Sequence, residues 1–340
     1  MTKMFAAFAL GAGLAAGFSG AAAAQTTLRL SNWLPPSHPI VKDMVVPWVE
    51  AVEEATEGRV TVQILDAPLG PPPAHFDLAA TGASDVVFGV HGYTPGRFSL
   101  TQIAELPFLA DSAEALSVAY WRVHEAMLAE AGEHRGVHVL GVFGHGPGML
   151  FTNGRPVTPV ADLDGAKIRV AGAITDRLAS ELDMVSIQAP SPKAFEILSG
   201  GVADGIFFPA ESVPFFKLDS ILDTALRAPG GLYNVSFFFV MNRDRYEALS
   251  PEDRDAIDSV SGEAFSRMAG EAWDAADAAG MAALEGVVTF HDADAADMEV
   301  LRAAADPIFA EVGEAFAAKG VDFDAALEML REEIDAVEGE

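Results

Sequence analysis

The sequence predicts an α/β fold built as two lobes. Its 340 residues exceed the usual size of one domain and fit two domains of common size. Half of the residues are hydrophobic, which is enough for a substantial core. Strand-like and helix-like patterns alternate along the chain, and such alternation is typical of lobes with a largely parallel sheet.

The first lobe is predicted to comprise residues 25–149 together with about 236–270. Its strands are expected at 27–32, 59–65, 85–90 and 137–143, and its helices at 39–57 and 112–132. The third of these strands is continuously apolar, as a strand buried between helices is. The second helix has Ser112 as its N-cap and ends at Gly132.

The second lobe is predicted to comprise residues 150–235 together with about 271–340. Within it, residues 162–211 read as strand, helix, strand and helix, followed by a tight turn at Asp204-Gly205 and a further apolar strand. Two acidic amphipathic helices, expected at 295–319 and 322–337, end the chain.

The chain is expected to cross between the lobes more than once. The most apolar strand, 236–241, should return it to the first lobe, and the crossings near 143–152 and 233–238 would form a hinge. A helix is predicted over 251–285, with Ser250 as its N-cap and a proline at its first position. It would span roughly 50 Å, at about 1.5 Å per residue, so we expect it to bridge both lobes.

The N-terminus has the features of a secretory signal peptide over residues 1–24. Lys3 precedes an apolar run, and the small-residue segment Ala22-Ala23-Ala24 stands directly before Gln25, so cleavage is expected after Ala24. The alternative is a membrane anchor, but the run is rich in Gly and Ala and short for a stable span. The mature protein is therefore expected outside the cytoplasm and not inserted in the membrane.

Composition excludes several classes of function. The formal charge is −29, and loss of Lys3 with the signal would make it −30. Such acidity repels nucleic acids and anionic membranes. The absence of cysteine excludes disulfides, thiol catalysis and zinc–thiolate sites. An anionic ligand would have to be attracted by a local cation.

Motifs for catalysis or nucleotide binding are weak. The eight histidines form no HExxH pattern, and the mature chain has neither GxSxG nor SxxK, so a secreted hydrolase is kept only as an alternative. The glycine cluster at 144–148 follows a strand, but Pro147 removes a donor amide and Met149 replaces the last glycine of a dinucleotide loop. We expect this segment to cross between lobes with His145 at the cleft, unless that histidine is merely structural.

Arg169 is the first candidate for a binding residue. Alternation over residues 167–170 puts Ile168 and Val170 on one face of a strand and Arg169 on the other. An exposed arginine at a strand end would explain this pattern. The second interpretation is a guanidinium that holds a carboxylate at the carboxyl end of a strand, where open α/β sheets place ligands.

Several segments resemble the periplasmic solute-binding proteins of tripartite ATP-independent (TRAP) transporters. They are DLDGAKIRV at 162–170, GVADG at 201–205, Leu232-Tyr233 and FVMN at 239–242. The resemblance implies a two-lobed periplasmic binding protein fold, type II-like, with a long helix between the lobes. It further implies a periplasmic receptor that delivers a small organic anion to the integral-membrane permease subunits. No cofactor is expected, with a bound cation as the alternative. In that family the arginine matching Arg169 grips the carboxylate of the ligand.

Two departures from the family pattern indicate the kind of ligand. Met149, before Thr152, stands where dicarboxylate and sialate binders carry a second arginine, and Phe208 stands where they often carry asparagine. A monocarboxylate with a hydrophobic or aromatic body is therefore favoured. A C4-dicarboxylate would leave one charge unpaired, at a cost of several kcal/mol in a closed cleft. A betaine-like zwitterion in an aromatic cage is a further alternative.

The remaining candidates surround the expected position of Arg169. By alternation, one of Phe207 and Phe208 should belong to the core and the other should face the ligand. Glu211 could accept from a ligand hydroxyl or ammonium, pair with Lys217, or help to hold a cation. The predicted ligand-binding residues are Asn32, Trp33, Tyr93, His145, Arg169, Phe207, Phe208 and Glu211.

Overall fold

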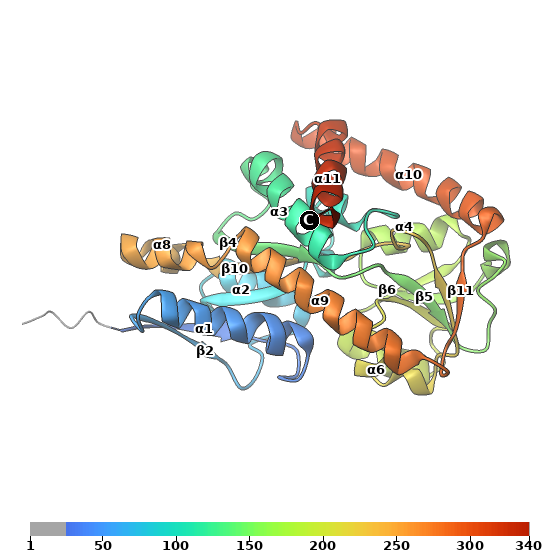
Figure 1. Cartoon of the computed structure of the whole chain (residues 1–340), viewed down its shortest axis with the longest axis horizontal. Helices are drawn as coiled ribbons and strands as arrows, with labels where there is room; N and C mark the ends of the chain where they lie inside the picture. The colour runs from blue at the N-terminus through green and yellow to red at the C-terminus, as the bar shows by residue number, and fades with distance from the viewer. Residues whose placement is uncertain (1–24, 340) are drawn as a thin grey trace, which may run out of the picture.

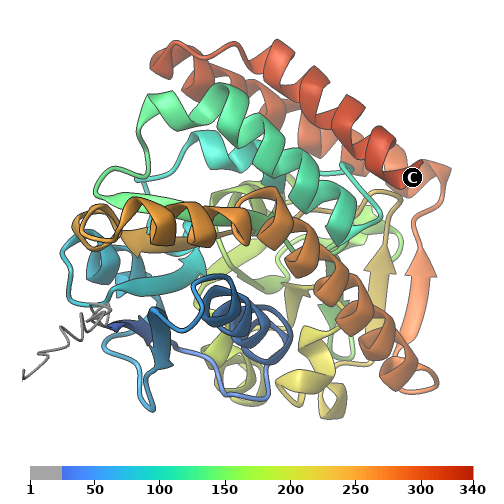
Figure 2. The same ribbon diagram turned by 60° about the vertical axis from the view of Figure 1, so that its left-hand side comes forward.

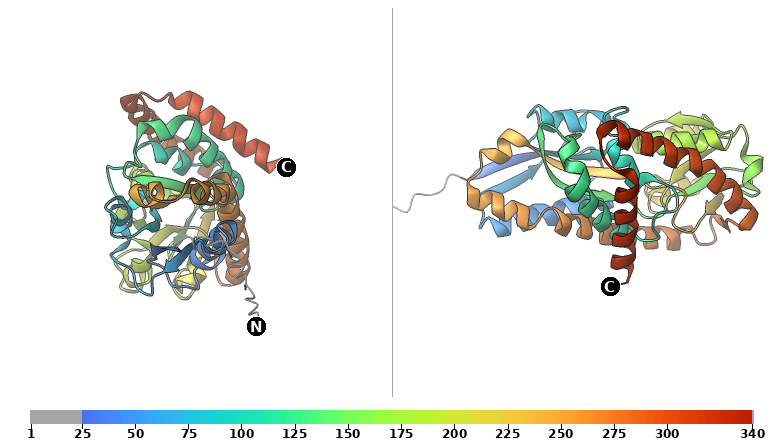
Figure 3. Two further views of the ribbon diagram at one scale, coloured as in Figure 1. Left: turned by 90° about the vertical axis from the view of Figure 1, so that its left-hand side faces the viewer. Right: turned by 90° about the horizontal axis from the view of Figure 1, so that it is seen from above.

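The computed structural model describes residues 25–339, so the signal peptide predicted at 1–24 lies outside the described residues. Two β-sheets form the centres of two lobes, which lie end to end along the long axis of the molecule (Figure 1; Figure 3, right). The strand orders are β2-β1-β3-β10-β4 and β11-β9-β5-β8-β6-β7. The α/β class and the two-lobed architecture are as predicted. No helix in the described part of the chain has both the length and the apolar character needed to cross a membrane.

The first sheet is mixed. Its strands are β1 (Thr26–Ser31), β2 (Val60–Ile64), β3 (Val86–Val90), β4 (Val137–Gly144) and β10 (Ser236–Asn242). β1 pairs in parallel with β2 and β3, whereas β10 lies antiparallel between β3 and β4. Every residue of β3 and β10 is buried, because helices cover both faces of these central strands.

The second sheet contains the strand that carries Arg169. Its strands are β5 (Met149–Thr152), β6 (Lys167–Val170), β7 (Val185–Gln188), β8 (Gly205–Phe208), β9 (Thr224–Arg227) and β11 (Thr289–Asp292). β6 lies parallel between β7 and β8, with Arg169 opposite Ile206. The carboxyl ends of these parallel strands therefore meet at one edge, which faces the other lobe.

Helices flank both sheets. They are α1 (Val46–Ala55), α2 (His75–Ala80), α3 (Ala113–Val123), α4 (Ala173–Glu181), α5 (Ala194–Ser199), α6 (Ser212–Phe215), α7 (Arg243–Glu247), α8 (Pro251–Ser259), α9 (Glu263–Leu284), α10 (Ala295–Lys319) and α11 (Phe323–Glu338). π-helical segments extend α1 at its start, Ile40–Val45, and α3 at its end, His124–Leu128. The predicted cap of α3 is present, since Ser112 Oγ accepts from the amide of Ala115 at 3.2 Å.

The single helix expected over 251–285 is wrong, because the structure has two helices there. The chain breaks at Gly262, which has φ 63° and ψ −130° and donates its amide to the carbonyl of Leu140 at 2.7 Å. α9 alone, about 33 Å long at 1.5 Å per residue, runs across both lobes (Figure 2). It contacts α3 and β4 of the first lobe and α6 of the second, so the bridging role belongs to α9.

The C-terminal helix does not belong to the second lobe, contrary to the boundary expected at 271–340. α11 packs along α3 of the first lobe. Its buried apolar face needs a partner and consists of Ala326, Leu327, Leu330, Ile334 and Val337. An ion pair between Arg122 Nη1 and Glu333 Oε2, at 2.6 Å, joins the two helices. α10 contacts α4 of the second lobe and leads back over the molecule to α11 (Figure 3).

Two of the segments that carry the chain between the sheets lie side by side, one from β4 to β5 and one from β9 to β10. They are bonded to each other, since the amide of Gly148 donates to Tyr233 O at 3.0 Å and the amide of Leu232 donates to Gly148 O at 2.9 Å. A Cβ at Gly148 would lie 2.3 Å from the ring of Tyr233, so only glycine permits this approach. This pair of crossing segments lies where the hinge was predicted.

Candidate functional site

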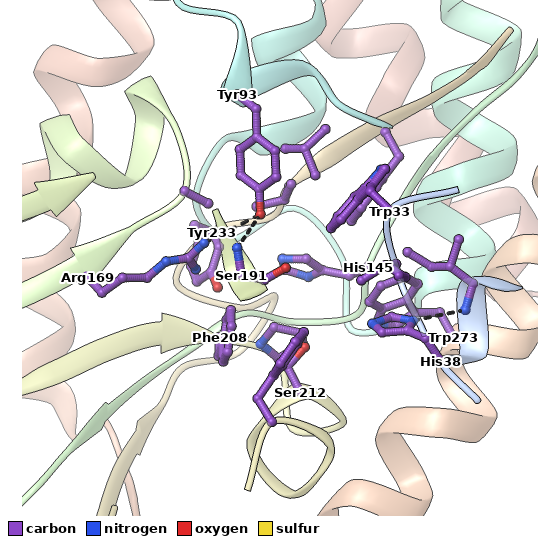
Figure 4. A pocket seen from close by; sticks show the side chains of 18 residues that line it. Trp33, His38, Tyr93, His145, Arg169, Ser191, Phe208, Ser212, Tyr233 and Trp273 are labelled. Atoms are coloured by element: carbon purple, nitrogen blue, oxygen red, sulfur yellow. Dashed lines mark hydrogen bonds between the residues drawn. The ribbon is translucent and has the colours of Figure 1, made fainter. Parts of the chain in front are cut away.

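A cavity of about 40 Å³ lies between the lobes, next to the crossing segments. Its walls come from both lobes and from α9, and Figure 4 shows the 18 residues that line it. Trp33 and Tyr93 belong to the first lobe, Arg169 and Phe208 to the second. These four were predicted as ligand-binding residues, and the structure brings them together.

Arg169 is held at this cavity although its side chain is only 1% exposed. Its Nε and Nη2 donate to the carbonyl of Ala189, at 2.8 and 2.5 Å, and its Cζ lies 4.9 Å from the centre of the Phe208 ring. No carboxylate of the described residues forms an ion pair with it, and its Nη1 makes no hydrogen bond to them. A buried guanidinium without a counter-ion is costly, so the arrangement is suited to receive an anion.

Tyr93 connects the two lobes directly at the guanidinium. Its hydroxyl accepts from the amide of Ser191 at 2.8 Å and lies 3.5 Å from Nη2 of Arg169. Beside it, a Cβ at Gly92 would lie 2.9 Å from Cα of Gly172, so the backbones of the two lobes touch. The structure therefore holds the lobes in a closed arrangement.

Aromatic rings form most of the remaining wall. Trp33 lies 6.0 Å from Tyr93 between ring centres and donates its indole N–H to Phe88 O at 3.1 Å. On the opposite side, Phe208 stacks on Phe216 at 5.7 Å. Because these rings are fixed by the core behind them, the cavity presents rigid apolar surfaces to a ligand.

Two histidines line the cavity, and both are neutral at pH 7. Burial lowers the pKa of His38 to about 3 and that of His145 to about 4. His38 Nδ1 accepts from the amide of Ile40 at 3.2 Å, and His145 Nδ1 lies 2.5 Å from Gly146 O. Among the lining residues, Arg169 is therefore the one side chain that carries a positive charge.

Three predicted residues are not in the lining of this cavity. Asn32 fixes a turn instead, since its Oδ1 accepts from the amide of Leu34 at 2.8 Å and its Nδ2 donates to Leu34 O at 2.7 Å. Phe207 points into the core and packs on Tyr233, at 5.3 Å between ring centres. Of the two alternating residues, Phe207 is therefore the one in the core, and Phe208 lines the cavity.

Glu211, the third, is buried behind the cavity wall. Its Oε2 accepts from Ser212 Oγ at 2.8 Å, and its amide donates to Asp277 Oδ1 of α9 at 2.8 Å. Burial raises the pKa of Glu211 and that of Asp277 to about 7. The expected ion pair with Lys217 is not formed. Within residues 25–339, no group of three His, Cys, Asp or Glu side chains is arranged to hold a metal ion.

Many of the lining residues were not predicted, and Trp273 and Tyr233 are two of them. Trp273 comes from α9, and no sequence signal ties that face of the helix to a cavity whose other lining residues lie between Trp33 and Phe237. Tyr233 lies in the Leu232-Tyr233 motif, which was a usable signal. Its hydroxyl makes no hydrogen bond within the described chain, and burial raises its pKa.

The chain is similar to known proteins over most of its length. The sequence model that describes the family of bacterial extracellular solute-binding proteins, family 7, matches residues 30–315 of this chain. A TRAP periplasmic solute-binding protein from Bordetella bronchiseptica, solved with bound (R)- and (S)-mandelate, is 43% identical with a TM-score of 0.90, covering 92% of this chain and 99% of that one. A TRAP solute-binding protein from Rhodoferax ferrireducens, solved with copurified benzoate, is 29% identical with a TM-score of 0.85, covering 92% and 98%.

One relative matches the chain over a similar length. The outer membrane transporter protein TsaT of Comamonas testosteroni is 32% identical over 310 residues, which are 91% of this chain and 92% of that protein. The resemblance to TRAP receptors is confirmed, and with it membership of a class of proteins that bind solutes. The chain belongs to the bacterial extracellular solute-binding proteins of family 7, the solute receptors of TRAP transporters.

Proposed function

We propose that this receptor captures an aromatic monocarboxylate in the cavity between its lobes and delivers it to the membrane subunits of a TRAP permease. The supporting observation is Arg169, a fully buried guanidinium with no acidic partner among the described residues and with Nη1 unpaired. A ligand carboxylate would supply the missing counter-charge through charge-assisted hydrogen bonds. Residues 1–24 would direct export to the periplasm and then be removed.

The charges at the cavity favour one acid group over two. Arg169 is the one cation of the lining, since His38 and His145 are neutral. Met149, which replaces the second arginine of dicarboxylate binders, lies in β5 opposite Phe208 and does not line the cavity. A C4-dicarboxylate would bury its second charge without a partner, which costs several kcal/mol.

The walls favour an aromatic body. Rings of both lobes face the cavity, and the two solved relatives described above hold mandelate and benzoate, which are aromatic monocarboxylates. The closed cavity, at about 40 Å³, is smaller than the roughly 150 Å³ in which a protein cavity accommodates benzene. We infer that the lobes separate to admit the ligand and close around it by rotation at the crossing segments.

Calorimetric titration of the mature protein with benzoate and with mandelate tests the proposal. Arg169→Gln should weaken both by more than about 100-fold, because it removes the buried positive charge. Its melting temperature should stay the same or rise, since an unpaired buried charge is lost. Arg302→Gln, which removes the same charge from the exposed surface of α10, is the matched control and should bind as wild type does. Binding by Arg169→Gln within a few fold of wild type would refute the role of Arg169.

The same titration separates the alternatives. Succinate tests a dicarboxylate, and glycine betaine tests a zwitterion, which the aromatic walls would also suit. Tighter binding of either than of both aromatic acids would contradict the proposed ligand class. For a secreted hydrolase, the discriminating observation is whether an ester of the same acid is recovered unchanged after long incubation with the protein.

A further inference from the structure

Besides Nη1 of Arg169 and the hydroxyl of Tyr233, two fully buried polar atoms in the wall of the cavity have no hydrogen-bond partner among residues 25–339. They are Nε2 of His145 and Nε1 of Trp273. Both side chains line the cavity, both are at most 3% exposed, and their ring centres are 6.0 Å apart. Figure 4 shows Trp273 across the cavity from Arg169. Buried polar groups are almost always satisfied in folded proteins, so two unpaired atoms in residues that line one cavity require an explanation.

The chemistry of the two atoms is complementary. The carbonyl of Gly146 can only accept, and His145 Nδ1 lies 2.5 Å from it, so Nδ1 carries the proton. Burial keeps the imidazole neutral, with a pKa of about 4, and Nε2 therefore presents a bare lone pair. The indole N–H of Trp273 is a donor and cannot accept. One acceptor and one donor thus belong to neighbouring rings in the wall of one cavity.

We propose that His145 and Trp273 read a hydroxyl group of the ligand, so that the receptor selects hydroxylated aromatic acids over their unhydroxylated parents. This inference rests on the proposed function, because it takes the carboxylate to be held by Arg169. A hydroxyl donates its proton to Nε2 of His145 and accepts the N–H of Trp273, which satisfies both atoms. A carboxylate can accept from the N–H of Trp273 but is repelled by the lone pair of His145. An ammonium group can donate to His145 but not accept from Trp273, so each group satisfies only one of the two atoms.

The energetic consequence is a penalty on the parent acid. A ligand that lacks the hydroxyl and excludes water leaves both buried groups unpaired, and sites built to bond a hydroxyl reject such analogues strongly. We expect hydroxylated acids to bind about tenfold or more tightly than their parents. A trapped water could satisfy both atoms instead, and in that case the parent acid would suffer no penalty.

The test compares matched ligand pairs by calorimetry. Benzoate is paired with 3-hydroxybenzoate and 4-hydroxybenzoate, and phenylacetate with mandelate, so the pairs separate a ring hydroxyl from one beside the carboxyl group. In wild type, at least one hydroxylated acid should bind about tenfold or more tightly than its parent. Equal binding within each pair would overturn the inference and leave the proposed function intact. If neither member of any pair binds, it is the proposed function that fails.

Two variants assign the preference to the two residues. His145→Asn keeps a donor for the carbonyl of Gly146 and removes Nε2, whereas Trp273→Phe keeps a ring and removes the N–H. Each should bring the ratio of the two dissociation constants toward one. The control is Phe237→Leu, since Phe237 lines the cavity 5.3 Å from Trp273 but has no polar atom. This control is expected to weaken both acids and preserve the ratio. A preference that survives in both His145→Asn and Trp273→Phe contradicts the inference, and either variant alone suffices should the other not fold.

Discussion

A single methyl group added to α9 at Gly280 should weaken ligand binding. A Cβ at this position would lie 2.6 Å from the carbonyl carbon of Ala210 and the amide nitrogen of Glu211, both in the second lobe. These are backbone atoms and cannot turn aside as a side chain would. In the closed arrangement, Gly280→Ala must therefore push the second lobe away from the helix.

The magnitude follows from where α9 is anchored. Asp274 accepts from Ser112 Oγ at 2.7 Å and from the amide of Ala113 at 2.6 Å, so the helix is bonded to the first lobe up to this turn. Overpacking costs roughly 1–3 kcal/mol, and alanine in a helix gains about 1 kcal/mol over glycine. The helix gain is the same in open and closed forms. Only the clash therefore enters the closing equilibrium, and it predicts about 5- to 150-fold weaker binding.

Titration with an aromatic acid measures this loss, and urea unfolding measures stability. The matched control is Gly270→Ala on the same helix, where a Cβ would lie 2.4 Å from Cα of Glu114, within the first lobe. That variant should unfold more easily and bind with unchanged affinity. Wild-type affinity in Gly280→Ala, together with reduced stability, would refute the reasoning, because it would mean that the end of α9 moves with the second lobe.

Two further predictions concern a contact between the lobes and a buried acid. Tyr93→Phe removes the acceptor of the Ser191 amide in the closed form, and a buried donor left unpaired costs about 1–3 kcal/mol, so calorimetry should show roughly 5- to 150-fold weaker binding. Unchanged affinity would show that closure does not depend on this bond. Burial raises the pKa of Glu105 to about 7, so its contribution to stability is full below its ordinary value of 4.5 and is lost as the pH rises through 7. Glu105→Gln, which can still accept from Ser236, should lose less melting temperature between pH 5 and 8 than wild type does, and an identical loss would contradict this assignment.

Periodicity alone identified the residues whose direction is set by a strand. Alternation separated Arg169 from its neighbours Ile168 and Val170, which lie in the core. It also required Phe207 and Phe208 to point to different faces, and in the structure Phe207 packs in the core while Phe208 lines the cavity. Which of the two faces the core depends on the register of β8 against β5 and β6, and this register is a tertiary property. The alternation of residues therefore predicted a small set of candidate site residues, and tertiary packing determines which of them line the cavity.

Contacts distant in the sequence decided the features that were not predicted. A glycine inside a helix lowers its stability by only about 1 kcal/mol, so the presence of Gly262 in the sequence was not enough to predict that the helix is broken there. The break depends on the bond from its amide to Leu140 O, more than a hundred residues earlier in the chain. In the same way, the apolar face of α11 predicts burial but does not name its partner α3. Trp273 was missed for this reason as well, because its cavity exists only once α9 lies across both lobes.

In the proposed function, the buried guanidinium of Arg169 links ligand recognition to closure of the lobes. When the lobes are apart, water can solvate Arg169, and closing them around an empty site removes that water with nothing to replace it. Closure of the empty protein is then opposed by the cost of desolvating one charge. A bound carboxylate offsets this cost, and it does so only in the closed form, where the effective dielectric constant is low. A ligand shifts a conformational equilibrium by its difference in affinity for the two forms, so an acid of the right charge closes the lobes whereas a neutral analogue of the same shape does not. In the proposed function, selectivity for an anion by a strongly acidic protein follows from the position of the one cationic residue of the cavity lining, between two lobes that must meet.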